Sequence, residues 1–430
     1  MNNLILGSVK ANNNTIETTF SCNGRMRKFF KNRKFVAEYN ISIEGTPPSI
    51  LTIPFLAVAC PVAWANNADI YVDECDETFL YSLKLIKKTL REFYPQMNFG
   101  GRIQVKNVVK VPNRNLSRKM VLYSGGVDSL ATLMRHQSEN PLLFTVMGKN
   151  FAPPFIADIA KDVSNKCGLE LRTVNNNPYG ILDLPMLAIF RKQTKGDWYR
   201  QVMHGLALLG LSAPVTYVDK IGTVYIAASL TNEMLEPYGS HPEIDNNVKW
   251  TGTHVIHDGH ELSRQQKIFL IANQMKKTLQ SHQLRVCNFP NLNGNCGRCE
   301  KCVRTIIGLE VAGMDPNLCG LPLQKDLGLY AKESLLKGNW DLDPHICWVW
   351  SDIQSSIIPN MQLPNPELRS FIEWLPTVDF KTIKSSTTRK SSKLKASFWE
   401  KGKPLMLYSP YFCHVMFRKF YNRFERYLHI

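Results

Sequence analysis

The sequence lacks an apolar run that could cross a bilayer. Its longest apolar stretch, residues 50–65, contains Pro54 and Pro61 and falls short of the roughly 20 residues that a membrane-spanning helix needs. The first residues show no basic region followed by an apolar run, so we expect no secretion signal and a cytoplasmic protein. Charged residues make up 20% of the chain and hydrophobic residues 44%, which argues against a disordered protein. A chain of 430 residues has room for two or three domains.

A disulfide framework is also missing. The cysteine count of eleven is odd, and without a secretion signal we expect reduced thiols. Four of the eleven form one cluster with the spacing C-x8-C-x2-C-x2-C: Cys287, Cys296, Cys299 and Cys302. Four thiolates at such spacings suit a tetrahedral Zn²⁺, and an iron–sulfur cluster is the alternative because both bind to four cysteines. A zinc ion held by four sulfurs is closed to substrate, so its predicted role is structural.

Positive charge is concentrated near the end of the chain. The net charge is +16, and residues 381–430 contribute +10 of it through twelve Lys and Arg against two Glu. Residues 412–428 place aromatic side chains at helical spacing beside Arg418, Lys419, Arg423 and Arg426. A basic aromatic helix can bind RNA, an acidic protein partner or a membrane surface. The alternative is a helix whose aromatic stripe packs on the protein's own core.

Residues 120–136 combine an apolar run, a glycine turn and a helix-like segment. Two glycines let backbone N–H groups approach an anion, and the following helix turns its positive end to the same point. The predicted phosphate-binding residues are Ser124, Gly125, Gly126, Val127, Asp128 and Ser129. The Asp128 carboxylate suits Mg²⁺ or a substrate amine better than bare phosphate. No Gly-Lys-Ser/Thr follows, which excludes a Walker A loop; a plain turn in an α/β domain is the alternative.

Strand and helix patterns alternate after residue 119. Expected strands lie at 120–123, 142–146, 171–174 and 224–228, and expected helices at 130–136, 156–167, 198–209 and 262–279. This alternation predicts an α/β fold with a doubly wound parallel sheet, whose ligands bind beyond the carboxyl ends of the strands. We therefore expect three parts: an N-terminal β-rich accessory domain (1–118), a domain with the phosphate-binding loop and the cysteine cluster (119–320) and a helical, basic C-terminal extension (321–430).

A long polar loop follows the last of these strands. At residues 229–245 it is too long for a simple connection, and Ser240, His241 and Asp245 are candidate substrate residues; a surface excursion is the alternative. His254, His257 and His260 follow nearby as further substrate contacts to test.

Arg264 and Lys267 share one face of the next predicted helix. There they could meet the phosphates bound at residues 124–129 and stabilise charge as pyrophosphate leaves, which makes both catalytic candidates together with Asp128. A solvated helix face is the alternative.

The Ser-Gly-Gly-x-Asp-Ser motif at 124–129 resembles the PP-loop of ATP pyrophosphatases, whose fold is of the adenine nucleotide alpha hydrolase type. Together with the cysteine spacing about 160 residues later, and with Arg304 just past it, residues 119–315 resemble the 7-cyano-7-deazaguanine synthase (QueC-type) family. The resemblance implies a C–N ligase that uses ATP and Mg²⁺ to adenylate a carboxylate or carbonyl oxygen. Pyrophosphate leaves before a nitrogen nucleophile attacks, and the zinc is structural.

The substrate half departs from the family pattern. The family is usually shorter, without counterparts of 1–118 and 321–430. Its Pro-Gly-Arg-Asn segment is replaced here by Trp198–Gly205, in which Arg200 and His204 are candidate substrate residues, and its Tyr-x-Asp-Cys stretch by Tyr238–Pro242.

The acceptor is therefore open. A deazapurine-like small molecule is the expected substrate, and some extended relatives occur in anti-phage defence operons and attach deazapurines to protein, a role that the resemblance allows. The alternative to an enzyme is a binding or assembly module that keeps the nucleotide fold without its chemistry and docks RNA or a protein partner through the basic tail.

Overall fold

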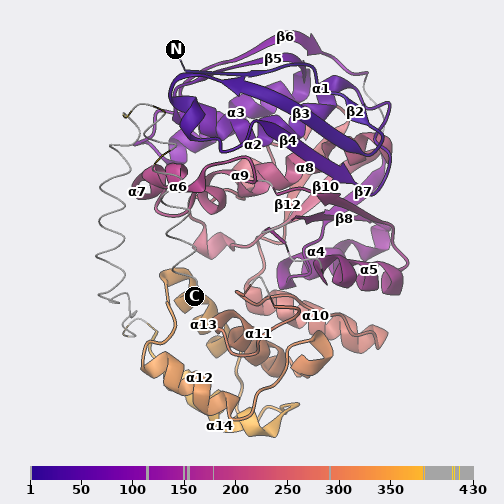
Figure 1. Ribbon diagram of the computed structural model, residues 1–430. Helices are drawn as coiled ribbons and strands as arrows, with labels where there is room; N and C mark the ends of the chain where they lie inside the picture. The colour runs from indigo at the N-terminus through magenta and orange to yellow at the C-terminus, as the bar shows by residue number, and fades with distance from the viewer. Residues whose placement is uncertain are drawn as a thin grey trace.

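The computed structural model describes residues 2–112, 116–148, 151–152, 155–177, 179–289, 292–380, 382, 409, 411 and 416. Within them, twelve strands form one mixed sheet (Figure 1). Its order is β11 (Lys249–Trp250), β12 (Thr253–Asp258), β10 (Ile221–Ala227), β7 (Arg118–Leu122), β8 (Leu142–Met147), β9 (Leu171–Asn175), β4 (Lys34–Tyr39), β3 (Thr15–Cys22), β1 (Asn3–Leu6), β5 (Asp69–Asp76) and β6 (Ile103–Val109), with β2 (Ala11–Asn12) beside β3.

The run β12-β10-β7-β8-β9 is parallel throughout. Its side chains alternate between two cores: Met120 and Leu122 of β7 belong to one, and Val121 to the other. One face is covered by α4 (Val127–His136), α5 (Phe155–Cys167), α10 (Arg264–Thr278) and α11 (Glu300–Val311), and the other by α2 (Ile53–Ala65), α3 (Glu77–Phe93) and α8 (His204–Val218). The predicted α/β class is confirmed. The sheet is mixed, and not purely parallel, because β4 joins β9 antiparallel.

The first 118 residues continue the same sheet. Tyr39 of β4 pairs with Val174 of β9, and the Tyr39 hydroxyl donates to the Leu211 carbonyl of α8 at 3.0 Å. The predicted boundary at residue 118 thus falls inside a continuous sheet. Two further short helices, α1 (Pro48–Leu51) and α9 (Pro242–Asp245), lie on this face, and α6 (Leu184–Leu187) and α7 (Arg191–Thr194) follow β9 along the chain.

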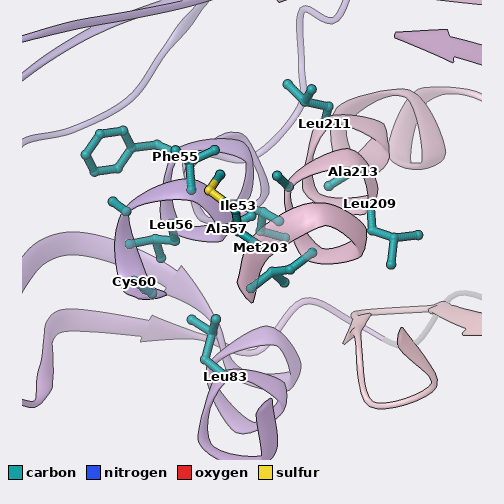
Figure 2. Close-up of a cluster of buried hydrophobic side chains, with 14 of the residues drawn as sticks. Ile53, Phe55, Leu56, Ala57, Cys60, Leu83, Met203, Leu209, Leu211 and Ala213 are labelled. Carbon is teal, nitrogen blue, oxygen red and sulfur yellow. The ribbon is translucent and has the colours of Figure 1, made fainter. Parts of the chain in front are cut away.

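The apolar run at 50–65 forms α1 and α2, which are almost entirely buried. Figure 2 shows side chains of α2, among them Ile53 and Ala57, packed beside those of α8, such as Leu209. The helices approach so closely that a Cβ on Gly210 would lie 2.5 Å from the Ala57 side chain. No described helix is both long and apolar enough to cross a membrane.

The C-terminal helices form a layer of their own on α10 and α11. They are α12 (Leu327–Leu336), α13 (Pro344–Ser355) and α14 (Arg369–Trp374), and with α10 and α11 they gather at the end of the molecule opposite β5 and β6 (Figure 1). Trp340 stacks on Trp350 with ring centroids 6.1 Å apart. The basic helix predicted at 412–428 lies outside the described residues, apart from Met416.

Candidate functional site

The loop between β7 and α4 is held in a fixed turn by its own hydrogen bonds. Gly125 has a φ of 75°, a conformation that favours glycine. The Ser124 N–H donates to Ser129 Oγ at 3.2 Å, and that hydroxyl donates to the Gly126 carbonyl at 3.2 Å. Gly126 is the N-cap of α4, and no side chain caps this helix end, so its first N–H groups are available to a ligand. The turn has the geometry of an anion cradle.

Asp128 contacts both of the cations predicted to act with it, Arg264 and Lys267. Arg264 Nη1 lies 2.7 Å from one carboxylate oxygen, and Lys267 Nζ lies 3.4 Å from the other. Burial raises the pKa of Asp128, but the charges of Arg264, Lys267 and Lys301 outweigh it and lower the pKa below its usual value. Asp128 is therefore a carboxylate at neutral pH.

Lys267 is a buried cation. Its side chain is 3% exposed, and its ammonium also donates to the Ala228 carbonyl at 2.6 Å, just past the end of β10. Burial lowers its pKa, although Asp128 opposes the shift. Because Arg264 and Lys267 begin α10 while Asp128 begins α4, two helix N-termini converge on one point with their charges.

Helix α11 carries two more cations, Lys301 and Arg304. The sequence did not predict that both would lie near Arg264. Arg304 is buried and pairs with Glu300 at 3.0 Å, and Glu300 also accepts a hydrogen bond from Trp350 Nε1 at 2.9 Å. Burial, with the charges of Arg264 and Arg304, lowers the pKa of Lys301 to about 8. The sequence held one signal for the position of Lys301. It lies between Cys299 and Cys302, so wherever the cysteine cluster lies, Lys301 lies beside it.

A cavity of about 310 Å³ opens beside the loop. One end is polar and contains Ser124, Gly126, Asp128 and Ser129. The remaining wall is mainly apolar and comes from β8, α5, the helical turn Tyr199–Met203, α8, β10 and the loops after the strands. Its residues include Phe144, Val146, Phe151, Ala152, Ile156, Tyr199, Leu208, Ile226 and Ala227. The cavity thus combines the polar groups of the loop with a mainly apolar lining.

Two predicted substrate residues, His204 and Ser240, also line this cavity. Ser240 Oγ donates to Asp245 Oδ2 at 2.6 Å, and His257 Nδ1 lies 2.8 Å from the same oxygen, so Asp245 orients both groups from behind. Burial lowers the pKa of His204 to about 4, against the opposing charge of Asp245. His204 is therefore neutral at pH 7 and can act as donor or acceptor.

Three polar atoms in this region are buried without a hydrogen-bond partner in the described part of the chain: the Tyr199 hydroxyl, His204 Nδ1 and Asp245 Oδ1. Tyr199 packs edge-on against Phe151 and Tyr179, with ring centroids 5.9 and 5.0 Å away. Buried polar atoms are costly to leave unpaired, so the Tyr199 and His204 atoms at the cavity wall fit a ligand that supplies the missing hydrogen bonds. Phe151 and Tyr199 were missed from the sequence because only their fold position brings them to the cavity.

The other three predicted substrate residues, Arg200, His241 and Asp245, are not among the described residues that line the cavity. His241 caps α9 by accepting the Glu243 N–H at 3.1 Å, and its ring packs on Phe93 at 4.8 Å. The Arg200 guanidinium lies over the Tyr238 ring at 5.7 Å. His254 and His260 likewise have local partners, Thr223 Oγ1 at 3.3 Å and the His257 carbonyl at 3.2 Å.

The four clustered cysteines come together as the spacing predicts. All four Sγ atoms lie within 4.8 Å of one another, and two of the pairs are 3.9 Å apart. Backbone N–H groups of Arg298 and Cys299 point at Cys296 Sγ at 3.4 and 3.1 Å, as expected around a metal-bound thiolate. The donor set fits a structural zinc, and the cluster could hold such a metal.

The cysteine segment also contacts the phosphate loop. The Arg285 N–H donates to the Gly125 carbonyl at 2.7 Å. Asn295 ties this segment to the cluster, because its side-chain oxygen accepts the N–H groups of Val286 and Cys287 at 3.0 and 3.1 Å. The segment that carries the four cysteines therefore contacts the phosphate loop directly.

No family model matches the sequence, and no curated protein is significantly similar to it.

Proposed function

We propose that this protein is an ATP-dependent C–N ligase of the QueC type, built on a PP-loop domain with a zinc-bound cysteine segment. It would adenylate a carboxylate or carbonyl oxygen of a deazapurine-like substrate, with release of pyrophosphate, before a nitrogen nucleophile attacks. The observation that carries the proposal is the meeting of Asp128, Arg264 and Lys267 at the Ser124–Ser129 loop. A protein acceptor, as in anti-phage defence, is included in this proposal.

The phosphate end of the cavity has the groups that this reaction needs. ATP supplies the adenylyl group that converts a poor leaving oxygen into a good one. The loop and the N-terminus of α4 would hold its phosphates, and Asp128 would share a Mg²⁺ with them. Arg264 and Lys267 lie where they would stabilise negative charge as it develops on pyrophosphate.

The other end suits the acceptor. The aromatic and aliphatic wall around Tyr199 and Leu208 would hold a planar heterocycle and exclude water. The neutral His204 and the oriented Ser240 would hydrogen-bond the polar edge of that ring. Because these groups are uncharged, they would suit the neutral ring of the substrate.

The test is pyrophosphate release from ATP and Mg²⁺ in the presence of 7-carboxy-7-deazaguanine and related deazapurines. Asp128→Asn should lower the rate by about 10²–10³-fold, because it removes the charge that positions the metal and both cations. Asp158→Asn is the matched control, since Asp158 also lies in the first turn of a helix but is exposed. An unchanged rate in Asp128→Asn, or no release by the wild type with any of these substrates, would overturn the proposal in favour of a non-catalytic module.

A further inference from the structure

The first turn of α10 is held by its own cap and by two neighbouring helices. In the cap, the Gln266 N–H donates to Ser263 Oγ at 3.1 Å, and the Ser263 N–H donates to Gln266 Oε1 at 2.8 Å. The Gln265 side chain donates to the Gly308 carbonyl of α11 at 2.9 Å. The backbone N–H of Gln265 donates to Asp352 Oδ2 of α13 at 3.0 Å. Helix α10 therefore begins at a point fixed by α11 and α13, which lie beside it (Figure 1).

Asp352 suits this position by its charge as well as by its geometry. A carboxylate at the start of a helix is stabilised by the positive end of the helix dipole and by N–H groups that have no partner within the helix. Among the described residues, Asp352 forms no ion pair with a cationic side chain, so its contact at this end of α10 is the Gln265 N–H. Helix α13 is itself fixed, because Trp350 and Ile353 belong to the same buried core as Ile268 of α10.

The turn that Asp352 holds carries the two cations of the phosphate end. Arg264 and Lys267 flank Gln265 in the sequence, and both contact Asp128. Because Asp128 belongs to α4, these contacts depend on where α10 begins relative to α4. The contact from Arg264 is 2.7 Å long, and a hydrogen bond of that length is lost once its atoms move about 1 Å apart. A small displacement of the first turn of α10 is therefore enough to disturb the phosphate end.

We propose that Asp352 is a positioning residue of the phosphate end, through which the C-terminal helices set the affinity of the site for polyphosphate. Asp352 would touch neither ATP nor the ring substrate. It would act through the Gln265 N–H, by fixing the turn from which Arg264 and Lys267 reach Asp128. The inference rests on the proposed function for its ligand, since polyphosphate is what the same site would bind.

The experiment measures the binding of inorganic pyrophosphate with Mg²⁺ by titration calorimetry, which requires no turnover. Asp352→Ala removes the acceptor of the Gln265 N–H. We expect its affinity for pyrophosphate to fall about 10-fold, because the two cations are no longer held in place before the ligand binds. Asp352→Asn keeps a side-chain oxygen that can accept the same N–H, so its affinity should stay within about 3-fold of the wild type.

Asp315→Ala is the matched control. Asp315 is half-buried, as Asp352 is, and also accepts a backbone N–H at 3.0 Å, that of Asn317 in the short helix Pro316–Cys319. Both alanine variants lose a carboxylate that caps a helix, so thermal unfolding should show a similar loss of stability in each. The affinity for pyrophosphate should fall in Asp352→Ala alone.

The outcomes separate the inference from the proposed function. Wild-type affinity in Asp352→Ala, or an equal loss of affinity in Asp315→Ala or in Asp352→Asn, would overturn the inference and leave the proposed function intact. If the wild type binds pyrophosphate but releases none from ATP with any deazapurine, the proposed function fails, and the comparison of the variants still decides the inference. A wild type that binds neither pyrophosphate nor ATP would overturn both.

Discussion

The two ends of the cavity are built in opposite ways. At the phosphate end, Asp128, Arg264 and Lys267 are charged groups that pair with one another across two helix N-termini. At the ring end, His204 and Ser240 are neutral. Ser240 donates a hydrogen bond to the buried carboxylate of Asp245, and the charge of the same carboxylate acts on His204. In the proposed function, the first arrangement would stabilise charge that changes during the reaction, and the second would select the shape of the substrate. Variants at the two ends should therefore separate turnover from substrate selection.

The largest expected effect is at Lys267. Lys267→Met keeps the length of the side chain but removes the ammonium that contacts Asp128 and the Ala228 carbonyl. We expect kcat for pyrophosphate release to fall about 10²-fold or more, because a preorganised charge in a buried site is lost. The KM for the ring substrate should change little.

Lys276→Met provides the control for that substitution. Lys276 lies on the same helix and also donates to a backbone carbonyl, that of Ala312 at 3.0 Å, away from the cavity. An equal loss of kcat in both variants would show that the effect comes from helix packing and not from the phosphate end.

The phosphate end is also the part that local sequence could predict. Residues 124–129 are contiguous, and Arg264 and Lys267 are one helical turn apart, so few long-range contacts are needed to place them. The cysteine cluster was predictable for the same reason. The ring end draws on residues around 151, 199–208, 226–229 and 240, and only the tertiary fold brings these segments together.

Single polar residues in the polar loop were harder to interpret for a related reason. Ser240 and His241 are neighbours, yet Ser240 lines the cavity while His241 caps α9 and packs on Phe93. A histidine at a helix N-cap looks like a free polar group in the sequence. Likewise, the pairing of β4 with β9 joins residues more than a hundred positions apart, and no local pattern encodes it. Strand β12 was missed because His254 and His257 interrupt its apolar pattern.

A second prediction concerns the pH dependence of stability, which should trace to the ring end. His204 has a pKa of about 4 in the fold, against about 6.5 when unfolded. The unfolded state therefore binds more protons between these values, and the free energy of unfolding should fall as the pH drops from about 6.5 toward about 4, by up to about 3 kcal/mol. Above pH 7 the effect should vanish.

Urea unfolding at several pH values measures this slope, and His204→Asn should flatten it. Asp128 cannot produce the same slope, because its pKa is lowered: its contribution to stability is kept above the unfolded carboxylate value and is lost only at more acidic pH. A wild-type slope that persists in His204→Asn would mean that another buried group titrates in this window, with His241 and His282 as the next to test, since burial lowers both of their pKa values.

The smallest expected effect is at Ser240, and it is the sharpest test of the division between the two ends. Ser240→Ala removes the 2.6 Å hydrogen bond to Asp245 and one polar group from the cavity wall. We expect KM for the ring substrate to rise about 3- to 10-fold, at a cost of about 1 kcal/mol in stability, while KM for ATP stays unchanged. Steady-state kinetics with each substrate varied in turn separates the two constants.

Ser212→Ala is the matched control, because Ser212 is equally buried and donates to the Leu209 carbonyl at 2.7 Å within α8. It should lose similar stability with neither KM altered. If Ser240→Ala instead raises both KM values together, the cavity acts as one site, and the assignment of neutral groups to ring selection is wrong.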